Sequence, residues 1–291
     1  MSVAEALPAR RETAGILVRA LRFARHHVLT VYALLAFTYL LLPIAIVILF
    51  SFNDPVGRFN LVWQGFTLDN WKNPFAFPGI QDAVVISLKI AVVSSLVATA
   101  LGTLIALALV RYRFRGRGAT NLLIFTPMAT PEIVMGASLL ALFLNLQGFL
   151  GFSIPLGFWT ILIAHIMFNI SYVVVTVKAR LVGFDRHLEE AAMDLGANEW
   201  TTFAKVTLPL IAPGVLAAAL LAFSLSVDDF VITYLNSGGT VTFPLFVWGA
   251  ARVEIRPQIN VIGTAIFVIA LLAMLANILL QWRRTPKGAT A

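Results

Sequence analysis

The chain has 291 residues, of which 59% are hydrophobic and only 12% are charged, and its mean hydropathy is +0.89. Soluble domains usually have about a quarter of their residues charged, so this composition excludes an ordinary soluble protein and indicates that lipid is the main solvent. The formal net charge is +7. The basic residues lie beside apolar runs, which favours a role in membrane orientation over nucleic-acid binding. The absence of cysteine excludes a disulfide framework and a thiolate metal site.

Continuous apolar runs predict the membrane-spanning helices. Crossing the hydrocarbon core takes about 20 apolar residues, and each run must be helical because lipid offers the backbone no hydrogen-bond partner. The first run is too long for the apolar core of a cleavable signal, so we expect it to be retained. The runs do not alternate, which excludes a barrel. Six runs are long enough: 28–52, 83–110, 122–146, 158–177, 208–234 and 259–281.

Basic residues in the connections predict the orientation. Most of the 21 Lys and Arg lie in the two termini and in the second-to-third and fourth-to-fifth connections. The positive-inside rule therefore places both termini in the cytoplasm. Residues 14–27 interleave apolar residues with arginines, which leaves open a helix on the membrane surface or a disordered tail. We expect a basic segment over 1–27 and a single transmembrane domain over 28–291.

The outward connection 53–82 is the longest, and it carries several aromatic residues among Pro, Gly and Asn. Aromatic residues near a membrane edge usually anchor the protein at the interface. A docking surface for an external partner is the alternative interpretation. The sequence does not decide between these two roles.

A charged residue inside the third span suggests a cation site. Glu132 lies about ten residues into the run 122–146, after Pro127 and Pro131. Each proline removes a backbone N–H and is expected to kink the helix. Freed carbonyls and a carboxylate together would suit a cation. The alternative is a hydrogen-bonded glutamate that joins two helices.

The fourth span carries polar and aromatic residues. His165 and Asn169 are four residues apart on one helix face, which favours hydrogen bonds between helices. Trp159, Phe168 and Tyr172 could line a path for an amine through cation–π contacts. The alternative is that these aromatic residues pack in the bundle or anchor the span.

The cytoplasmic connection 178–208 holds the most specific pattern. Apolar residues recur at the i, i+3, i+4, i+7 spacing of one helix face, and acidic residues fall away from that face. The apolar set is Leu188, Ala191, Ala192 and Leu195, and the acidic set is Glu189, Glu190 and Asp194. We expect Asp185 to cap this short helix and Gly196 to end it, before a second short helix. The apolar face either docks in a partner's groove or folds back on the bundle.

These residues resemble a family signature. Glu190-Ala191-Ala192, then Gly196, then Val206-Thr207-Leu208-Pro209 are similar to the EAA motif of binding-protein-dependent ABC importer permeases, with Val206 in place of the usual isoleucine. The resemblance covers about residues 82–281, with 28–52 as an added first span. It implies an all-α integral membrane protein of the type I ABC importer permease fold, with six transmembrane helices and a cytoplasmic coupling helix. The implied coupling residues are Leu188, Glu189, Glu190, Ala191, Ala192, Asp194, Leu195 and Gly196.

The resemblance also implies partners. The coupling helix would sit in a groove of a cytoplasmic ATPase subunit. The chain has no G-x-x-x-x-G-K-[ST] phosphate loop, so we expect a non-catalytic subunit whose partner binds ATP and Mg. The implied assembly has a second permease subunit, two ATPase subunits and an extracytoplasmic substrate-binding protein. It would lie in the lipid bilayer of a bacterial cytoplasmic membrane, without nucleic acid.

Two further stretches bear on the substrate. Residues 223–238 (FSLSVDDFVITYLNSG) and 130–136 (TPEIVMG) resemble the C-type membrane subunits of spermidine/putrescine permeases. Acidic residues outnumber basic residues within the spans, which suits a polycation better than sulfate or phosphate.

Adjacent helical positions point about 100° apart, so we expect one of Asp228 and Asp229 to face the pathway and the other a neighbouring helix. A structural pair between Lys89 and one aspartate is the alternative. The expected pathway residues are Asp228, Asp229, Glu132, Tyr172 and Trp159.

Three other functions are alternatives. Related permease subgroups handle opines or iron chelates, so the substrate is open within the family. An ion-coupled secondary transporter also uses acidic residues inside the membrane. A membrane-embedded enzyme would need a nucleophile with a base or a metal cluster, and His165 lacks a partner at a metal-binding spacing.

Overall fold

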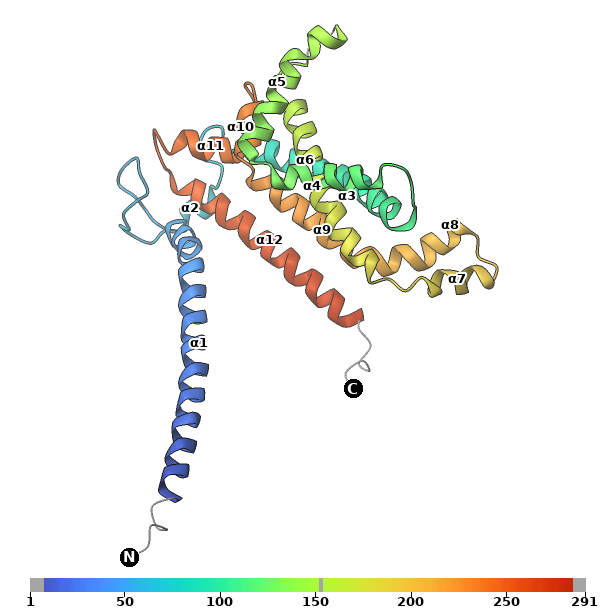
Figure 1. Cartoon of the computed structure of the whole chain (residues 1–291). Coiled ribbons are helices and arrows are strands. Elements are labelled where there is room, and N and C mark those ends of the chain that lie inside the picture. Colours follow the sequence, from blue (N-terminus) through green and yellow to red (C-terminus); the bar gives the residue numbers. More distant parts are fainter. Residues whose placement is uncertain (1–7, 152–153, 285–291) are drawn as a thin grey trace, which may run out of the picture.

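The computed structural model describes residues 8–151 and 154–284 (Figure 1). Helices make up most of this part of the chain. In order they are α1 (Pro8–Phe50), α2 (Asp69–Lys72), α3 (Ile80–Arg111), α4 (Arg117–Ala129), α5 (Glu132–Leu150), α6 (Phe158–Val182), α7 (His187–Asp194), α8 (Glu199–Thr202), the π-helix η2 (Phe203–Thr207), α9 (Leu208–Asp228), α10 (Val231–Asn236), α11 (Phe243–Ala250) and α12 (Pro257–Arg284).

The expected spans match the long apolar helices. Within the described residues, five helical segments are long and apolar enough to cross a membrane. They lie in α1, α3, α6, the stretch that ends with α9, and α12. The pair α4 and α5 makes a sixth span if the two are counted together. Residues 14–27 lie within α1, which runs from Pro8 to Phe50 without a break.

The third span is broken, and the break is sharper than the expected kink. The helix axis bends by 109° between α4 and α5. Thr130 has an extended backbone, as expected for a residue that precedes proline, because the ring of Pro131 clashes with a helical neighbour. Glu132 therefore lies in the first turn of α5 instead of the middle of a continuous helix.

The fifth span ends earlier than predicted. The apolar run suggested a helix over 208–234, but α9 ends at Asp228 and the backbone of Asp229 is extended (φ −61°, ψ 124°). The chain then begins α10, and the Asp229 carboxylate accepts the N–H of Thr233 in its first turn at 2.8 Å. Hydropathy continues across this point, so apolar content alone could not show that a side chain caps a new helix there.

The core is formed where α3, α6 and α9 pack together. The face of α3 in this core carries small residues, including Ala98, Gly102 and Ala106. A Cβ built on Gly102 would lie 2.6 Å from Cγ1 of Val173 on α6 and 3.3 Å from the carbonyl oxygen of Ile170. Small residues let helix backbones approach closely, which is how transmembrane helices gain packing contacts without a hydrophobic driving force.

Replacing Gly102 with Ala is expected to lower the free energy of unfolding by about 1–3 kcal/mol, because α3 and α6 must separate. The double variant Gly102→Ala, Val173→Ala should recover most of this loss, since the clash is with Val173. Gly118→Ala on α4 is the control, because nothing lies within 4 Å of its Cβ position. Thermal unfolding midpoints in one detergent measure the series. Equal midpoints for Gly102→Ala and Gly118→Ala would contradict the close packing.

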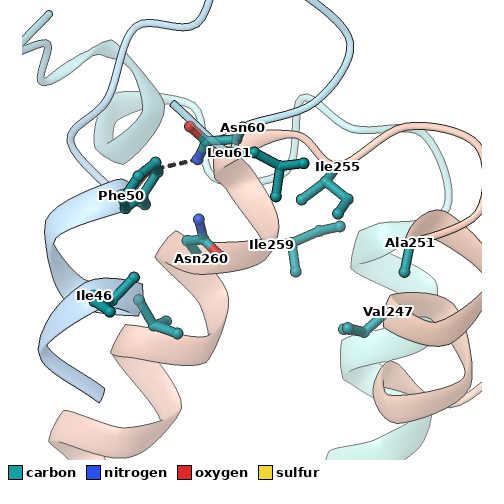
Figure 2. A pocket seen from close by; sticks show the side chains of 10 residues that line it. Ile46, Phe50, Asn60, Leu61, Val247, Ala251, Ile255, Ile259 and Asn260 are labelled. Atoms are coloured by element: carbon teal, nitrogen blue, oxygen red, sulfur yellow. Dashed lines mark hydrogen bonds between the residues drawn. The ribbon is translucent and has the colours of Figure 1, made fainter. Parts of the chain in front are cut away.

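The outward connection folds onto the end of α1. Asn53 and Asn60 are buried, and the Asn53 amide donates to Oδ1 of Asn60 at 2.6 Å. Nδ2 of Asn60 donates to the carbonyl of Phe50 at 2.8 Å. A cavity of about 310 Å³ lies beside this region, between α1, α11 and α12, and its lining is mostly apolar apart from Asn60 and Asn260 (Figure 2). The connection is therefore ordered and held against the end of α1 by these hydrogen bonds.

Candidate functional site

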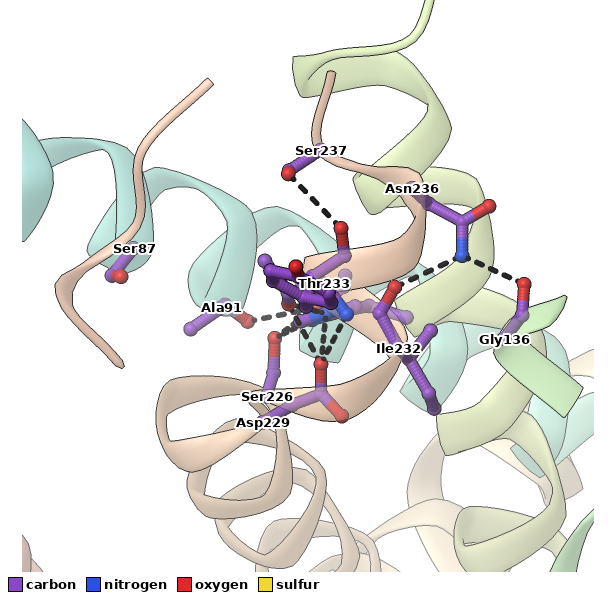
Figure 3. A network of polar contacts seen from close by, with 12 residues as sticks. Ser87, Ala91, Gly136, Ser226, Asp229, Ile232, Thr233, Asn236 and Ser237 are labelled. Carbon is purple, nitrogen blue, oxygen red and sulfur yellow. Dashed lines mark hydrogen bonds and ion pairs between the residues drawn. The ribbon is translucent and has the colours of Figure 1, made fainter. Parts of the chain in front are cut away.

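A buried polar network joins α6 to α9 and α10 (Figure 3). Nδ1 of His165 lies 2.6 Å from Oγ of Ser226. Nε2 of His165 lies 2.9 Å from Oγ1 of Thr233 and 3.2 Å from Oδ2 of Asp229. The side chains of His165 and Asp229 are only 3% and 6% exposed. The predicted interhelical hydrogen bonding of His165 is thus confirmed.

The hydrogen bonds indicate where the protons lie. Oδ2 of Asp229 accepts from both the N–H and the hydroxyl of Thr233, at 2.8 and 2.7 Å. With that hydroxyl proton used, Nε2–H of His165 is the third donor toward Asp229. Nδ1 then accepts from Ser226, which in turn accepts from Ser94 of α3 at 3.1 Å. In this arrangement each of these polar side chains has at least one hydrogen-bond partner.

The two adjacent aspartates have opposite environments. Asp229 points into the network, whereas Asp228 is exposed and lines a cavity of about 410 Å³. Phe230 and Trp248 line the same cavity, with ring centroids 5.3 Å apart. As expected, one aspartate, Asp229, faces a neighbouring helix, and a pathway role for Asp228 stays a prediction. The cause of this difference is the extended backbone of Asp229 and not the 100° step between helical neighbours.

Glu132 and Tyr172 lie near Asp228. Tyr172 packs against a cluster that contains Met135 of α5 and Ile232 of α10, so it lies near the two chain breaks that hold Glu132 and Asp228. Tyr172 is half-buried, with its ring 4.9 Å from that of Phe168 in the core. The breaks between α4 and α5 and between α9 and α10 thus bring two carboxylates and a phenol together. This arrangement could hold an amine through charge and aromatic contact.

Trp159 does not join this group. It lies in the first turn of α6, 66% exposed, with its ring 5.4 Å from that of Phe158. Along α6 it is separated from Tyr172 by 13 residues, or about 20 Å at 1.5 Å per residue. A pathway role for Trp159 would therefore need a second contact point, and its role stays a prediction.

Neither the alternative pair between Lys89 and an aspartate nor the expected hydrogen bond of Asn169 is found among the described residues. Lys89 is exposed, and none of the ion pairs found among the described residues includes it. Lys89 lies five residues before Ser94, nearly on the opposite face of α3, so it points away from the network. Asn169 is fully buried, but neither atom of its amide has a hydrogen-bond partner in the described part of the chain.

The cytoplasmic connection forms the predicted short helix, α7. The residue directly before the helix is Arg186 and not the expected Asp185, but Oδ1 of Asp185 accepts the N–H of His187 at 3.0 Å. Gly196 has φ +88°, a left-handed conformation that favours glycine. Its N–H donates to the carbonyl of Met193 at 2.9 Å, and the next N–H, of Ala197, donates to Ala192 at 3.0 Å. These two bonds are the Schellman ending expected for a helix that stops at glycine.

The apolar face of α7 does not fold back on the bundle. No residue of α7 is buried, and Leu195 is 90% exposed. Trp200 of α8 is also exposed, at 75%. The acidic residues differ in their contacts. Among the described residues, the exposed Glu190 side chain pairs only with His187 of its own helix, whereas Glu189 contacts Arg111 and Thr207. An exposed apolar face on an ordered helix is suited to a partner's groove.

Several residues of these sites were missed by sequence reasoning. Ser94, Ser226 and Thr233 complete the buried network, and Arg111 contacts Glu189. The available signal was weak: the three hydroxyls are polar positions inside apolar runs, and such residues are common in transmembrane helices as interhelical donors. Arg111 is one of the basic residues of the second-to-third connection, and the sequence indicates only its role in membrane orientation.

Known proteins are similar to this chain in sequence or in fold. Residues 98–284 match the family described as binding-protein-dependent transport system inner membrane component. The chain is 41% identical over 255 residues to the spermidine/putrescine transport system permease protein PotC of Escherichia coli K12, covering 87% of this chain and 93% of the relative. It is 39% identical over 238 residues to the putrescine transport system permease protein PotI of the same organism, covering 81% and 84%.

Two solved structures are similar in fold. A bacterial ABC transporter involved in the import of the acidic polysaccharide alginate matches with a TM-score of 0.67 and 18% identity, over 92% of this chain and 99% of that one. An amino acid ABC transporter matches with a TM-score of 0.52 and 19% identity, over 74% and 96%. At 18–19% identity, these matches show the fold and do not indicate the substrate.

Proposed function

This chain belongs to the family of binding-protein-dependent transport system inner membrane components, and on that premise we propose that it is the polyamine permease subunit of an ATP-driven importer. The similarity to the two Escherichia coli permeases, whose names specify spermidine and putrescine, supports the substrate class. The single structural observation that carries it is that Tyr172 packs against a cluster with residues of α5 and α10, beside the chain breaks that hold Glu132 and Asp228. Protonated amines pair with carboxylates and aromatic faces, and an acidic region offsets their desolvation.

The exposed helix α7 supports coupling to a separate ATPase. Its apolar residues are available for docking, and the chain lacks a phosphate-binding loop of its own. ATP and Mg would therefore bind to the partner ATPase, and this chain would have no catalytic role. Closure of two ATPase subunits would displace α7 and switch access to the solute site.

The proposed assembly contains four kinds of subunit. This chain pairs with a second permease subunit, two ATPase subunits bind the coupling helices, and an extracytoplasmic binding protein delivers the solute. The chain lies in a bacterial cytoplasmic membrane with both termini in the cytoplasm, as the distribution of basic residues supports. Residues 1–27 form a basic cytoplasmic segment and 28–291 a single permease domain. Alternating access comes from rocking of the two permease chains around a site near the midplane.

Reconstitution tests this proposal. We expect proteoliposomes that hold the complete complex, with the binding protein outside, to accumulate labelled spermidine or putrescine. Accumulation should require ATP inside the vesicle, on the side that corresponds to the cytoplasm. A complex with a hydrolysis-deficient ATPase is the control and should give no accumulation. Transport by this chain alone, without ATP, would instead favour an ion-coupled carrier. Mass spectrometry of the solute that co-purifies with the binding protein distinguishes a polyamine from an opine or an iron chelate.

A further inference from the structure

Glu189 is the point at which α7 touches the membrane bundle. Within the described residues, it is the one side chain of α7 that hydrogen-bonds outside its own helix. Its carboxylate accepts from the guanidinium of Arg111, the last residue of α3, and from the hydroxyl of Thr207, the last residue of η2. The Glu189 side chain is only 14% exposed, although no residue of α7 is buried as a whole.

The three groups form a closed ring of hydrogen bonds. Nη2 of Arg111 donates to the Glu189 carboxylate and also lies 3.3 Å from Oγ1 of Thr207. Thr207 is fully buried and directly precedes α9, so it is a fixed part of the bundle. Bonds between ionised groups in a partly shielded site are stronger than those between neutral groups. The ring therefore joins α7 to the inner ends of both α3 and α9.

A second contact holds the start of α7. Nη2 of Arg186, the residue before the helix, donates to the carbonyl of Val110 in the last turn of α3 at 2.9 Å. The first turn of α7 is thus attached to α3 at two adjacent positions. The far end of α7 stops at Gly196, where a Cβ would have nothing within 4 Å, so that end is open.

We propose that Glu189 is a positioning residue that fastens the coupling helix to α3 and α9, and that it is not part of the surface that meets the ATPase. When α7 is displaced, the ring makes α3 and α9 move with it. These two helices carry Ser94 and Ser226 of the buried network and pack together in the core, so the movement reaches the region of Asp228 and Asp229. The inference rests on the proposed transport function and deepens it.

The first test measures the attachment itself and needs no solute. In the purified complex with its ATPase, hydrogen–deuterium exchange of residues 187–194 should become about tenfold faster in Glu189→Ala. Glu189→Gln keeps an acceptor oxygen without the charge, so its exchange should be intermediate. The charge swap Glu189→Arg, Arg111→Glu should slow exchange again. Arg113→Ala is the control, because Arg113 is exposed close to Arg111 but is outside the ring.

The second test measures transmission. We expect Glu189→Ala to retain the ATPase subunits while the ATP hydrolysed per solute imported rises about fivefold or more, and the charge swap to restore the ratio in part. A merely structural defect would lower hydrolysis and import together. Unchanged exchange in Glu189→Ala, with or without loss of the ATPase subunits, would overturn the proposal. If the wild-type complex imports no polyamine, the transport proposal fails, whereas the exchange result still decides the role of Glu189.

Discussion

Replacing Leu195 with Asp is expected to abolish coupled import while leaving the chain folded. Leu195 is 90% exposed, so the substitution removes almost no contact within the chain. In the assembled transporter, the same change would place an unpaired carboxylate in an apolar contact. The truncation of a central interface residue commonly costs 2 kcal/mol or more, which is about a 30-fold loss of affinity. A buried unpaired charge adds to that cost.

Co-purification and uptake measure this effect. We expect Leu195→Asp to bind the ATPase subunits at least about 30-fold more weakly, with uptake falling in parallel. Val253→Asp in the connection between α11 and α12 is a matched control, since Val253 is 67% exposed and receives the same charge away from α7. Its ATPase binding and thermal midpoint should equal those of the unmodified chain. Normal ATPase binding by Leu195→Asp would mean that the apolar face of α7 is not the docking surface.

The second large effect is an asymmetry between Asp228 and Asp229. Asp229 accepts two bonds from Thr233 and faces His165, all inside the protein. Asn at this position brings an N–H₂ group toward donors and removes the charge that they stabilise. Hydrogen bonds to charged groups contribute about 1.5–3 kcal/mol, so Asp229→Asn should lower the stability by about that amount. Import should fall as well, because the charge that holds the start of α10 beside His165 is removed.

Asp228→Asn should behave differently, because Asp228 is exposed and outside the network. We expect its stability to stay within about 0.5 kcal/mol of the unmodified chain, with a loss of at least about tenfold in polyamine uptake. Thermal unfolding of the purified chain and uptake into proteoliposomes separate the two quantities. Unchanged uptake in both variants would remove the aspartates from the pathway. An equal loss of stability in both would contradict the buried network.

The origin of this asymmetry shows the limits of the sequence. Two adjacent aspartates near the end of an apolar run predict that one faces inward, but not which one. The decision comes from His165 and Thr233, the first of them more than 60 residues away in the sequence. In the same way, Glu189 was grouped with the docking residues because its spacing matches theirs. Only the approach of Arg111, on another helix, places it in the bundle.

The local features of this chain followed from the sequence alone. Apolar runs determine which segments enter lipid, proline removes backbone donors near the break at Glu132, and Gly196 ends α7, because each effect depends on a residue and its near neighbours. Only the tertiary structure decided where α9 ends, which carboxylate is buried and what Asn169 and Lys89 meet. Those outcomes depend on side chains brought together from distant helices, and the energy of a buried polar group is set by its partners in space.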